Sequence, residues 1–282
     1  MDHATNPSEH HMIAKAAEFS NRYVGQGAAA WERQKGLPPE GIRAAAEAGL
    51  CGMLLAEDLG GKALSKSAMA RVMEELSKAD MAYAFVLIVH NNLMNAIADN
   101  GTQEQKARYL PAMLSGECLG AFLLTEGQGG SDAANVTTTA RRERGGWIID
   151  GAKVWVSNAA TAGLLSVYAQ TDADLGSRGI ACFLIEADCQ GVIREVPYAM
   201  LGAHAMGVGE GAAIPAAHAK KFATQAAERG VTACMQAMGA NGYKHEYPLA
   251  RHLACARMAN YIDGTTEIQN VVISRDLLRP FV

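Results

Sequence analysis

The hydrophobic pattern of this chain changes its period twice, and those two changes limit what it can fold into. Apolar residues recur at helical spacing from about Pro38 to Cys118. From Leu119 to about Gly209, short β-branched and aromatic runs alternate with turns rich in Gly and Asp. Helical spacing returns after Pro215. The order of helices, sheet and helices predicts an α+β fold.

These changes predict three domains: an N-terminal helical domain at 1–118, a small antiparallel β-domain at 119–210, and a C-terminal helical segment at 211–282. Met81–Ile97 is apolar nearly all round, which predicts a buried helix. Thr102 and Gln105 form a capping box that starts another helix, which we expect Pro111 to end. We expect the first dozen residues to be a loose tail.

The β-domain carries one strong turn signal, Asp150-Gly151, which predicts a hairpin over Trp147–Ser157. In the C-terminal segment, Thr266 and Gln269 predict a capping box. The remaining predicted strands are Val136–Thr139, Leu165–Gln170 and Ile180–Ile185, and the predicted C-terminal helices are 216–238, 247–261 and 266–278.

Charge and cysteine usage exclude several classes of protein. With 25 Lys plus Arg against 29 Asp plus Glu, the net charge is −4 and neither half is basic, which argues against nucleic-acid binding. The longest apolar run, Met81–Val89, is far shorter than the roughly 20 residues of a membrane helix. The N-terminus lacks the apolar region of a secretory signal. Six cysteines without a CxxC pair make metal and disulfide frameworks poor candidates and favour the cytoplasm.

Two segments of the β-domain could carry chemistry. Leu124–Asp132 contains three glycines, whose backbone amides could converge on phosphate oxygens, although a solvated turn would read the same way. Ser131 lies in a near miss to the GxSxG nucleophile elbow, so a serine hydrolase is a rival. We expect Trp155 and Ser157 to share one face of a strand, which suits a flat heteroaromatic ligand or ordinary packing.

A third segment joins two predicted helices. Asp263 precedes Gly264, which would let the backbone approach a ligand, and Thr265 opens a helix whose amides could hold phosphate. A helix-capping turn with a solvated carboxylate explains the same residues.

Taken together, these segments resemble the acyl-CoA dehydrogenase family of flavoproteins. Thr125-Glu126, Gly130–Asp132 and Asp150–Asn158 are similar to the flavin-binding motif of its β-domain, in order and spacing. Gln236–Tyr243, Tyr247-Pro248, Arg251 and Asp263–Gln269 are similar to its C-terminal motif, and Leu59–Gly61, Glu74–Leu76 and Gly101–Lys106 to its N-terminal domain.

The resemblance implies an FAD-dependent enzyme of fatty acid metabolism that dehydrogenates an acyl-CoA thioester between its α and β carbons. Electrons would pass to an electron-transfer flavoprotein, and the enzyme would be a homo-oligomer. By position, Asp263 is the catalytic base. Thr125, Trp155 and Ser157 lie around the isoalloxazine ring, Ser131 and Gly264 lie near the substrate, and Gln236, Gly239 and Thr265 lie along the FAD phosphates and adenosine.

Two departures from the family pattern leave alternatives open. Asp263 stands where most of the family has Glu, roughly 1.5 Å longer, and the nitroalkane-oxidising branch also has Asp here. After Gly207–Glu210, about a hundred residues are missing, the order of two bundle helices. An Arg-x-x-Phe-Gly motif is missing with them, since no Phe in the chain precedes Gly. A flavin oxidase of a nitroalkane and a degenerate non-catalytic relative are therefore the alternatives.

Overall fold

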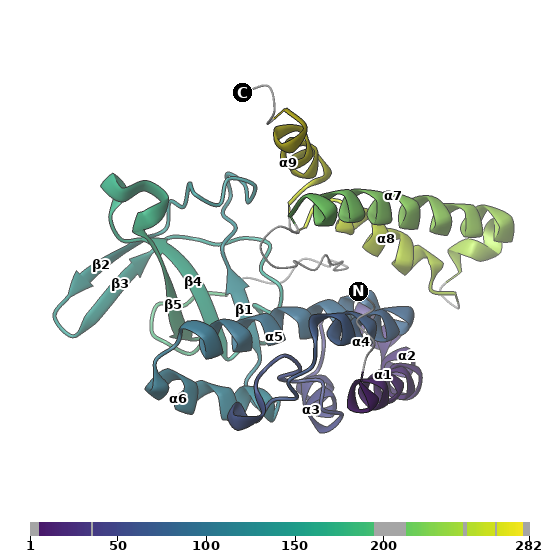
Figure 1. Ribbon diagram of the computed structural model, residues 1–282, viewed down its shortest axis with the longest axis horizontal. Coiled ribbons are helices and arrows are strands. Elements are labelled where there is room, and N and C mark those ends of the chain that lie inside the picture. The colour runs from purple at the N-terminus through teal and green to yellow at the C-terminus, as the bar shows by residue number, and fades with distance from the viewer. Residues whose placement is uncertain (1–5, 35, 195–212, 245–246, 263, 279–282) are drawn as a thin grey trace. The chain divides into compact units, whose positions relative to one another are not determined.

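The protein is described here as a computed structural model covering residues 6–34, 36–194, 213–244, 247–262 and 264–278 (Figure 1). It divides into two compact units. The first contains 1–36, 65–85 and 199–282, and the second contains 37–64 and 86–198. The α+β class predicted from the sequence is confirmed.

The first unit begins with a capped helix, so the loose tail predicted there is wrong. The Asn6 side chain accepts a hydrogen bond from the Glu9 amide (2.9 Å), and the Glu9 carboxylate accepts from the Asn6 amide (3.0 Å) and the Ser65 amide (2.8 Å). This reciprocal cap fixes the helix start from residue 6 onward. The N-terminal helices of this unit are α1 (Pro7–Phe19), a π-helical turn (Ser20–Val24), α2 (Gly25–Gln34) and α4 (Lys66–Ala79).

The C-terminal part of the first unit forms the three helices that the sequence predicts. They are α7 (Ala213–Met238), α8 (Leu249–Ala259) and α9 (Thr266–Leu278), with a 3-10 turn at Gly239–Tyr243. On α8, Cys255 and Ala259 pack against Met81. Along α7, by contrast, much of the surface faces solvent, and Phe222 is 71% exposed.

In the second unit, the apolar helix α5 is buried as predicted. The helices of the second unit are α3 (Pro39–Glu47), a 3-10 turn (Glu57–Leu59), α5 (Met81–Asn100) and α6 (Gln103–Leu114). The first five residues of α5 belong to the first unit. The capping box of Thr102 and Gln105 is confirmed. The expected end at Pro111 is wrong, because α6 continues to Leu114. Burial of Leu110 and Met113 offsets the hydrogen bond that proline removes.

By length and composition, α5 is the one helix among the described residues that could cross a membrane: 20 residues with a mean hydropathy of 1.3. Two of its polar side chains, His90 and Asn91, are buried inside the fold. Asn91 donates to the carbonyls of Leu50 and Leu87 and accepts from the amides of Gly52 and Met53. Such internal bonds are typical of a core helix.

The sheet of the second unit is mixed rather than purely antiparallel. Its strands are β1 (Gly120–Leu123), β2 (Thr139–Glu143), β3 (Gly146–Asp150), β4 (Leu164–Gln170) and β5 (Ile180–Glu186). β4 is central: β5 pairs with it antiparallel along its whole length, while β1 and the first residue of β2, Thr139, pair with it in parallel. Neither parallel pair joins consecutive strands, since parallel neighbours need a longer connection than a tight turn.

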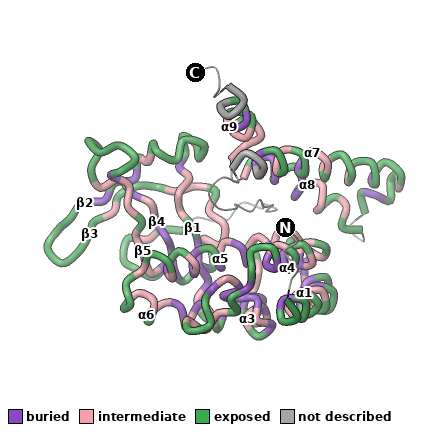
Figure 2. Tube along the Cα trace, viewed as in Figure 1, coloured by how far each residue is buried: buried purple, intermediate pink, exposed green. Residues whose placement is uncertain are grey.

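The hairpin of this sheet lies one strand earlier than predicted. β2 and β3 pair through a turn at Arg144-Gly145, and Asp150-Gly151 ends β3. At Gly151 (φ +154°) the backbone passes so close to Thr138 that a Cβ would lie 2.5 Å from its hydroxyl oxygen. The predicted run Val136–Thr139 is strand only at Thr139. Figure 2 shows the hairpin exposed along most of both strands.

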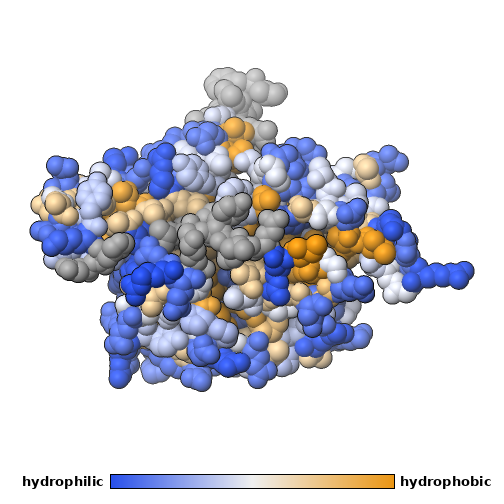
Figure 3. Space-filling model, turned by 180° about the vertical axis from the view of Figure 1, so that it is seen from behind, coloured by the Kyte–Doolittle hydropathy of each residue, from blue (hydrophilic) through white to orange (hydrophobic). Residues whose placement is uncertain are grey.

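The inner face of the sheet is incompletely covered. Leu165 and Val167 of β4 are buried, whereas their β5 neighbours Ile185 and Phe183 are only partly buried. Seen from behind, strongly hydrophobic residues gather on the sheet beside the hairpin (Figure 3). Leu123, Ile149, Val156 and Val192 pack against the core cluster that contains Leu165 and Val167, and they too are only partly buried.

A fully buried histidine joins α5, α6 and β1. His90 Nε2 donates to the Met113 carbonyl (3.0 Å), and its Nδ1 accepts from the Gly120 amide (3.1 Å). Both bonds require the neutral ring, in the tautomer that carries its proton on Nε2. Burial, outweighing the bond to Met113, lowers the pKa of His90 to about 4.

We predict that stability depends on pH through His90. Because the unfolded chain binds this proton near pH 6.5, the contribution is complete above that pH. It is lost as pH falls toward 4, by about 3 kcal/mol. Urea unfolding of wild type and His90→Gln between pH 4 and 7.5 measures it. Glutamine keeps a donor and an acceptor but does not titrate, so equal pH dependence in both proteins would contradict the prediction.

Candidate functional site

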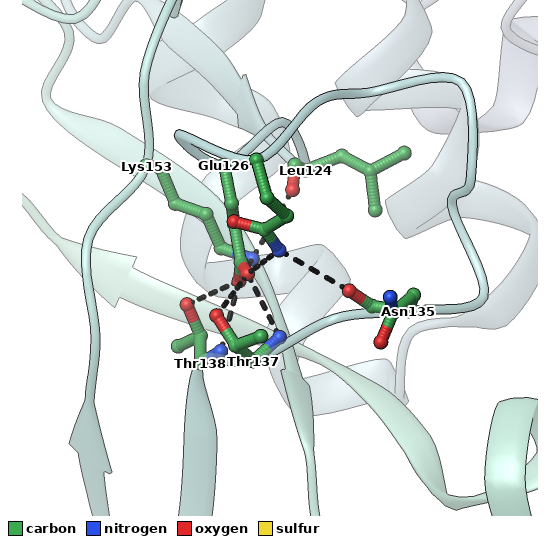
Figure 4. Close-up of polar contacts among 7 residues, drawn as sticks. Leu124, Glu126, Asn135, Thr137, Thr138 and Lys153 are labelled. Carbon is green, nitrogen blue, oxygen red and sulfur yellow. Dashed lines mark hydrogen bonds and ion pairs between the residues drawn. The ribbon is translucent and has the colours of Figure 1, made fainter.

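The loop that follows β1 is organised by a buried ion pair between Glu126 and Lys153. Lys153 Nζ lies 2.7 Å from Glu126 Oε1, and the two side chains are 5% and 2% exposed. The carboxylate also accepts hydrogen bonds from the amides and hydroxyls of Thr137 and Thr138 and from the Gln128 side chain (Figure 4). Lys153 further donates to the Leu124 carbonyl (3.2 Å). A buried charge is tolerated only when it is paired in this way.

Glu126 is ionised at any working pH. Burial alone would raise the pKa of its carboxyl, but the hydrogen bonds from Lys153, Thr137, Thr138 and Gln128 outweigh that effect and hold it far below its usual range. The carboxylate is saturated with donors inside the fold. Its role is therefore to fix the loop rather than to exchange protons.

The ion pair brings Thr125 and the segment that carries Trp155 together. Between them, the Val154 amide donates to the Thr125 carbonyl (2.9 Å). Trp155 is 62% exposed and adopts φ +59°, a left-handed conformation that is strained for a bulky residue. It is not in a strand, so the predicted strand face shared with Ser157 is wrong. An exposed indole held in a strained backbone is a recognised mark of functional sites.

The glycine-rich loop contributes small residues and hydroxyls beside Thr125. A Cβ at Gly130 would lie 2.9 Å from the Thr125 hydroxyl oxygen, so a larger residue there would displace the Thr125 side chain. Ser131 is exposed. Within the described residues, the hydroxyls of Thr125, Ser131 and Ser157 make no hydrogen bond to the protein. No helix follows Ser131 before β2, which removes the strand–turn–helix context that a nucleophile elbow needs.

In the first unit, Gln236 and Gly239 lie at the C-terminal end of α7. Gln236 is exposed, and Gly239 (φ +56°) ends the helix in a left-handed turn. Gln236 borders an open concavity of about 530 Å³ on α7, together with Gln225, Glu228, Arg229, Thr232 and Ala233.

The turn between α8 and α9 contains the remaining predicted residues, and Asp263 lies outside the described residues. Gly264 has φ +86°, a left-handed conformation that favours glycine. Thr265 caps α9, since its hydroxyl accepts from the Ile268 amide (3.3 Å). The predicted cap at Thr266 is one residue too late, because that hydroxyl bonds to the Asn260 side chain instead (3.2 Å). Hydrogen bonds from its own amide and from Thr265 lower the pKa of Glu267.

The structure thus collects Thr125, Ser131, Trp155 and Ser157 in the second unit, and Gln236, Gly239, Gly264 and Thr265 in the first. Sequence reasoning missed Glu126 and Lys153 as organising residues, although both stand inside the flavin-type motif. Among the described residues, no cluster of three or more His, Cys, Asp or Glu side chains could hold a metal ion.

Comparisons with known proteins agree along the length of the chain. Models of the acyl-CoA dehydrogenase N-terminal, middle and C-terminal domains match residues 6–117, 121–212 and 193–278. The chain is 32% identical over 177 residues to mitochondrial isobutyryl-CoA dehydrogenase of Dictyostelium discoideum, covering 63% of this chain and 42% of that protein. It is 40% identical over 143 residues to isovaleryl-CoA dehydrogenase of Solanum tuberosum, covering 50% and 35%. The chain therefore spans less than half of the length of these two relatives.

A longer alignment reaches most of another relative. An acyl-CoA dehydrogenase of Bacillus subtilis is 26% identical over 361 aligned positions, covering 93% of this chain and 95% of that protein. That alignment is longer than this chain's 282 residues, as expected where it bridges missing residues. Among solved structures, butyryl-CoA dehydrogenase from Megasphaera elsdenii shares the fold, with a TM-score of 0.85 and 24% identity over 99% of this chain and 100% of that one.

We predict that Glu126 and Lys153 stabilise the protein as a pair. Glu126→Gln or Lys153→Met alone leaves an uncompensated buried charge, which costs about 3–5 kcal/mol. The double variant should lose less than the sum of the two single losses, because it buries no lone charge. Urea unfolding of the four proteins gives the coupling energy. Additive losses would contradict the pairing.

Proposed function

This chain belongs to the acyl-CoA dehydrogenase family, and on that premise we propose that it removes hydrogen from the α and β carbons of an acyl-CoA thioester with FAD as cofactor. The observation that carries the proposal is the hydrogen bond from the Val154 amide to the Thr125 carbonyl. It places Thr125 beside the strained Trp155 segment, and the buried ion pair holds the two segments together. The proposal includes a division of the chain into three domains, at residues 1–118, 119–210 and 211–282.

The residues present fit a flavin. The exposed Trp155 indole offers a flat apolar surface on which an isoalloxazine ring can stack. The hydroxyls of Thr125 and Ser157 could hydrogen-bond its polar edge, and Ser131 would lie near phosphate or the acyl-CoA. We assign Gln236, Gly239 and Thr265 to the FAD phosphates and adenosine. When bound, the flavin would supply the acceptor for the β-hydride.

In the proposed reaction, the residues of this chain remove the α-proton and orient the thioester substrate. Asp263 would take the α-proton of the thioester as general base, which requires hydrogen-bond distance from carboxylate to carbon-bound proton. Gly264, next to it, lets the backbone approach the substrate without a side chain in the way. Donors directed at the thioester carbonyl would stabilise the enolate that develops.

One observation favours a second candidate. The carboxylate at 263 is Asp, one methylene shorter than Glu, and a small acidic substrate could sit closer to it than a thioester. A flavin oxidase of a nitroalkane is therefore the alternative. We further propose a cytoplasmic enzyme whose electrons pass to an electron-transfer flavoprotein, in place of direct transfer to oxygen.

We predict that Asp263→Asn lowers α-proton exchange of butyryl-CoA in D₂O by at least about 100-fold, because it removes the base, while flavin content stays unchanged. Glu267→Gln, which removes a neighbouring carboxylate on α9, is the matched control and should exchange normally.

Two measurements separate the acyl-CoA dehydrogenase from its alternatives. The first is the flavin absorbance of the purified protein. The second is turnover of butyryl-CoA and of nitroethane, each with an artificial acceptor and with oxygen. Nitroethane oxidation alone supports the nitroalkane oxidase. A colourless protein without exchange supports the non-catalytic relative. Undiminished exchange in Asp263→Asn overturns the assignment of the base.

We predict that the protein self-associates and that FAD affinity depends on assembly. Phe222 on α7 and the partly buried residues on the sheet expose apolar surface. Covering a few hundred Å² is worth several kcal/mol, at about 25 cal/mol per Å². Sedimentation velocity at several concentrations, with flavin absorbance recorded, measures both effects, and Phe222→Ser should weaken association. A sharp monomer with stoichiometric FAD would contradict the prediction.

A further inference from the structure

One face of α7 holds the turn between α8 and α9. Lys220, Thr224 and Glu228 are spaced four residues apart, so they lie above one another along the same side of the helix. Each of them bonds to the stretch that runs from the end of α8 to the start of α9. Lys220, Thr224 and Glu228 together form the α7 ladder.

Two members of the α7 ladder, Thr224 and Glu228, bind the side chain of Asn260. Thr224 Oγ1 donates to Asn260 Oδ1 (3.0 Å), and Asn260 Nδ2 donates to Glu228 Oε2 (3.3 Å). Asn260 also accepts from the Thr266 hydroxyl. Glu228 pairs with Arg257 of α8 (3.0 Å). These contacts set the register of α7 against the end of α8.

Lys220 bonds to the turn itself. Its Nζ donates to the carbonyl of Ile262 (2.7 Å) and to the carbonyl of Gly264. Those two carbonyls flank position 263 on either side. Gln269 Nε2 adds a second donor to the Gly264 carbonyl (3.2 Å). Lysine suits this role, since its ammonium carries three donors that can reach carbonyls in different directions.

We propose that Lys220 is the positioning residue for the catalytic base, holding the backbone on both sides of position 263 so that its carboxylate meets the substrate α-proton. The inference rests on the proposed function, in which Asp263 is that base. A misplacement of about 1 Å in such a group can cost a factor of 100 in rate. The short Asp side chain leaves the backbone to set the position of the carboxylate.

A purely structural brace would make the same hydrogen bonds, so the test needs variants that separate the two roles. Lys220→Met removes the donors and the charge, and Lys220→Arg keeps both. Lys221→Met is the matched control, because Lys221 carries the same charge about 100° further round the helix. Thr224→Val loosens the turn through Asn260 and leaves Lys220 intact.

The assay is α-proton exchange of butyryl-CoA in D₂O by the flavin-loaded protein, measured against pH and substrate concentration. In Lys220→Met the maximal exchange rate should fall about 10- to 100-fold with KM changed less than about 2-fold. The acid limb of its pH profile should move up by about one pH unit, because the variant loses a cation that is bonded to the backbone on both sides of position 263. The other charged groups around the turn, Glu228, Arg257 and Glu267, are unchanged.

The other variants have distinct expected results. Lys220→Arg should recover most of the rate, Lys221→Met should stay within about 2-fold of wild type, and Thr224→Val should lose stability without moving the acid limb. Hydrogen–deuterium exchange of the backbone amides at 260–266 should rise in Lys220→Met, a readout that needs no turnover.

Three outcomes overturn the inference. In the first, Lys220→Met keeps the wild-type rate and acid limb while wild type exchanges. In the second, Lys220→Met loses rate, but Thr224→Val shifts the acid limb equally, which makes the α7 ladder a structural brace only. In the third, wild type shows no exchange, which removes the proposed function together with the inference that rests on it.

Discussion

The buried ion pair of Glu126 and Lys153 is the interaction on which the middle of the chain depends. Water is excluded from both side chains, so every charge and every lone pair there must find a partner inside the protein. Thr137 and Thr138, which directly precede β2, supply partners with both their amides and their hydroxyls. The pair therefore decides where β2 begins as well as which residues emerge beside the loop.

The same pair explains why one clear local signal was misleading. Asp150-Gly151 has the composition of a hairpin turn, but the residues after it are held by Lys153 to a loop 27 residues earlier in the chain. Asn158 anchors the far end by donating to the carbonyls of Val86 and Gly120. Between these two anchors Trp155 is forced to positive φ. No short-range pattern contains that information, because the competing contacts are distant in sequence.

Elements whose causes are local could be predicted. The capping box at Thr102 and the apolar length of α5 can be recognised from the sequence, and the box at Asn6 and Glu9 has an equally local cause. Motif residues such as Thr125 and Trp155 could be named from the sequence. The contacts of Lys220 could not, because its partners are backbone carbonyls, which every residue possesses.

The C-terminal segment shows what fixes a position when apolar packing is sparse. Much of α7 faces solvent, so hydrophobic contact alone allows the helix to slide or rotate against α8 and α9. Directional bonds from Thr224 and Glu228 to Asn260 remove that freedom, because a slide of one residue would turn both donors and acceptors away. The orientation of the turn at Ile262 and Gly264 then follows largely from the register of α7, because Lys220 bonds to both of their carbonyls and only Ile262 adds apolar packing.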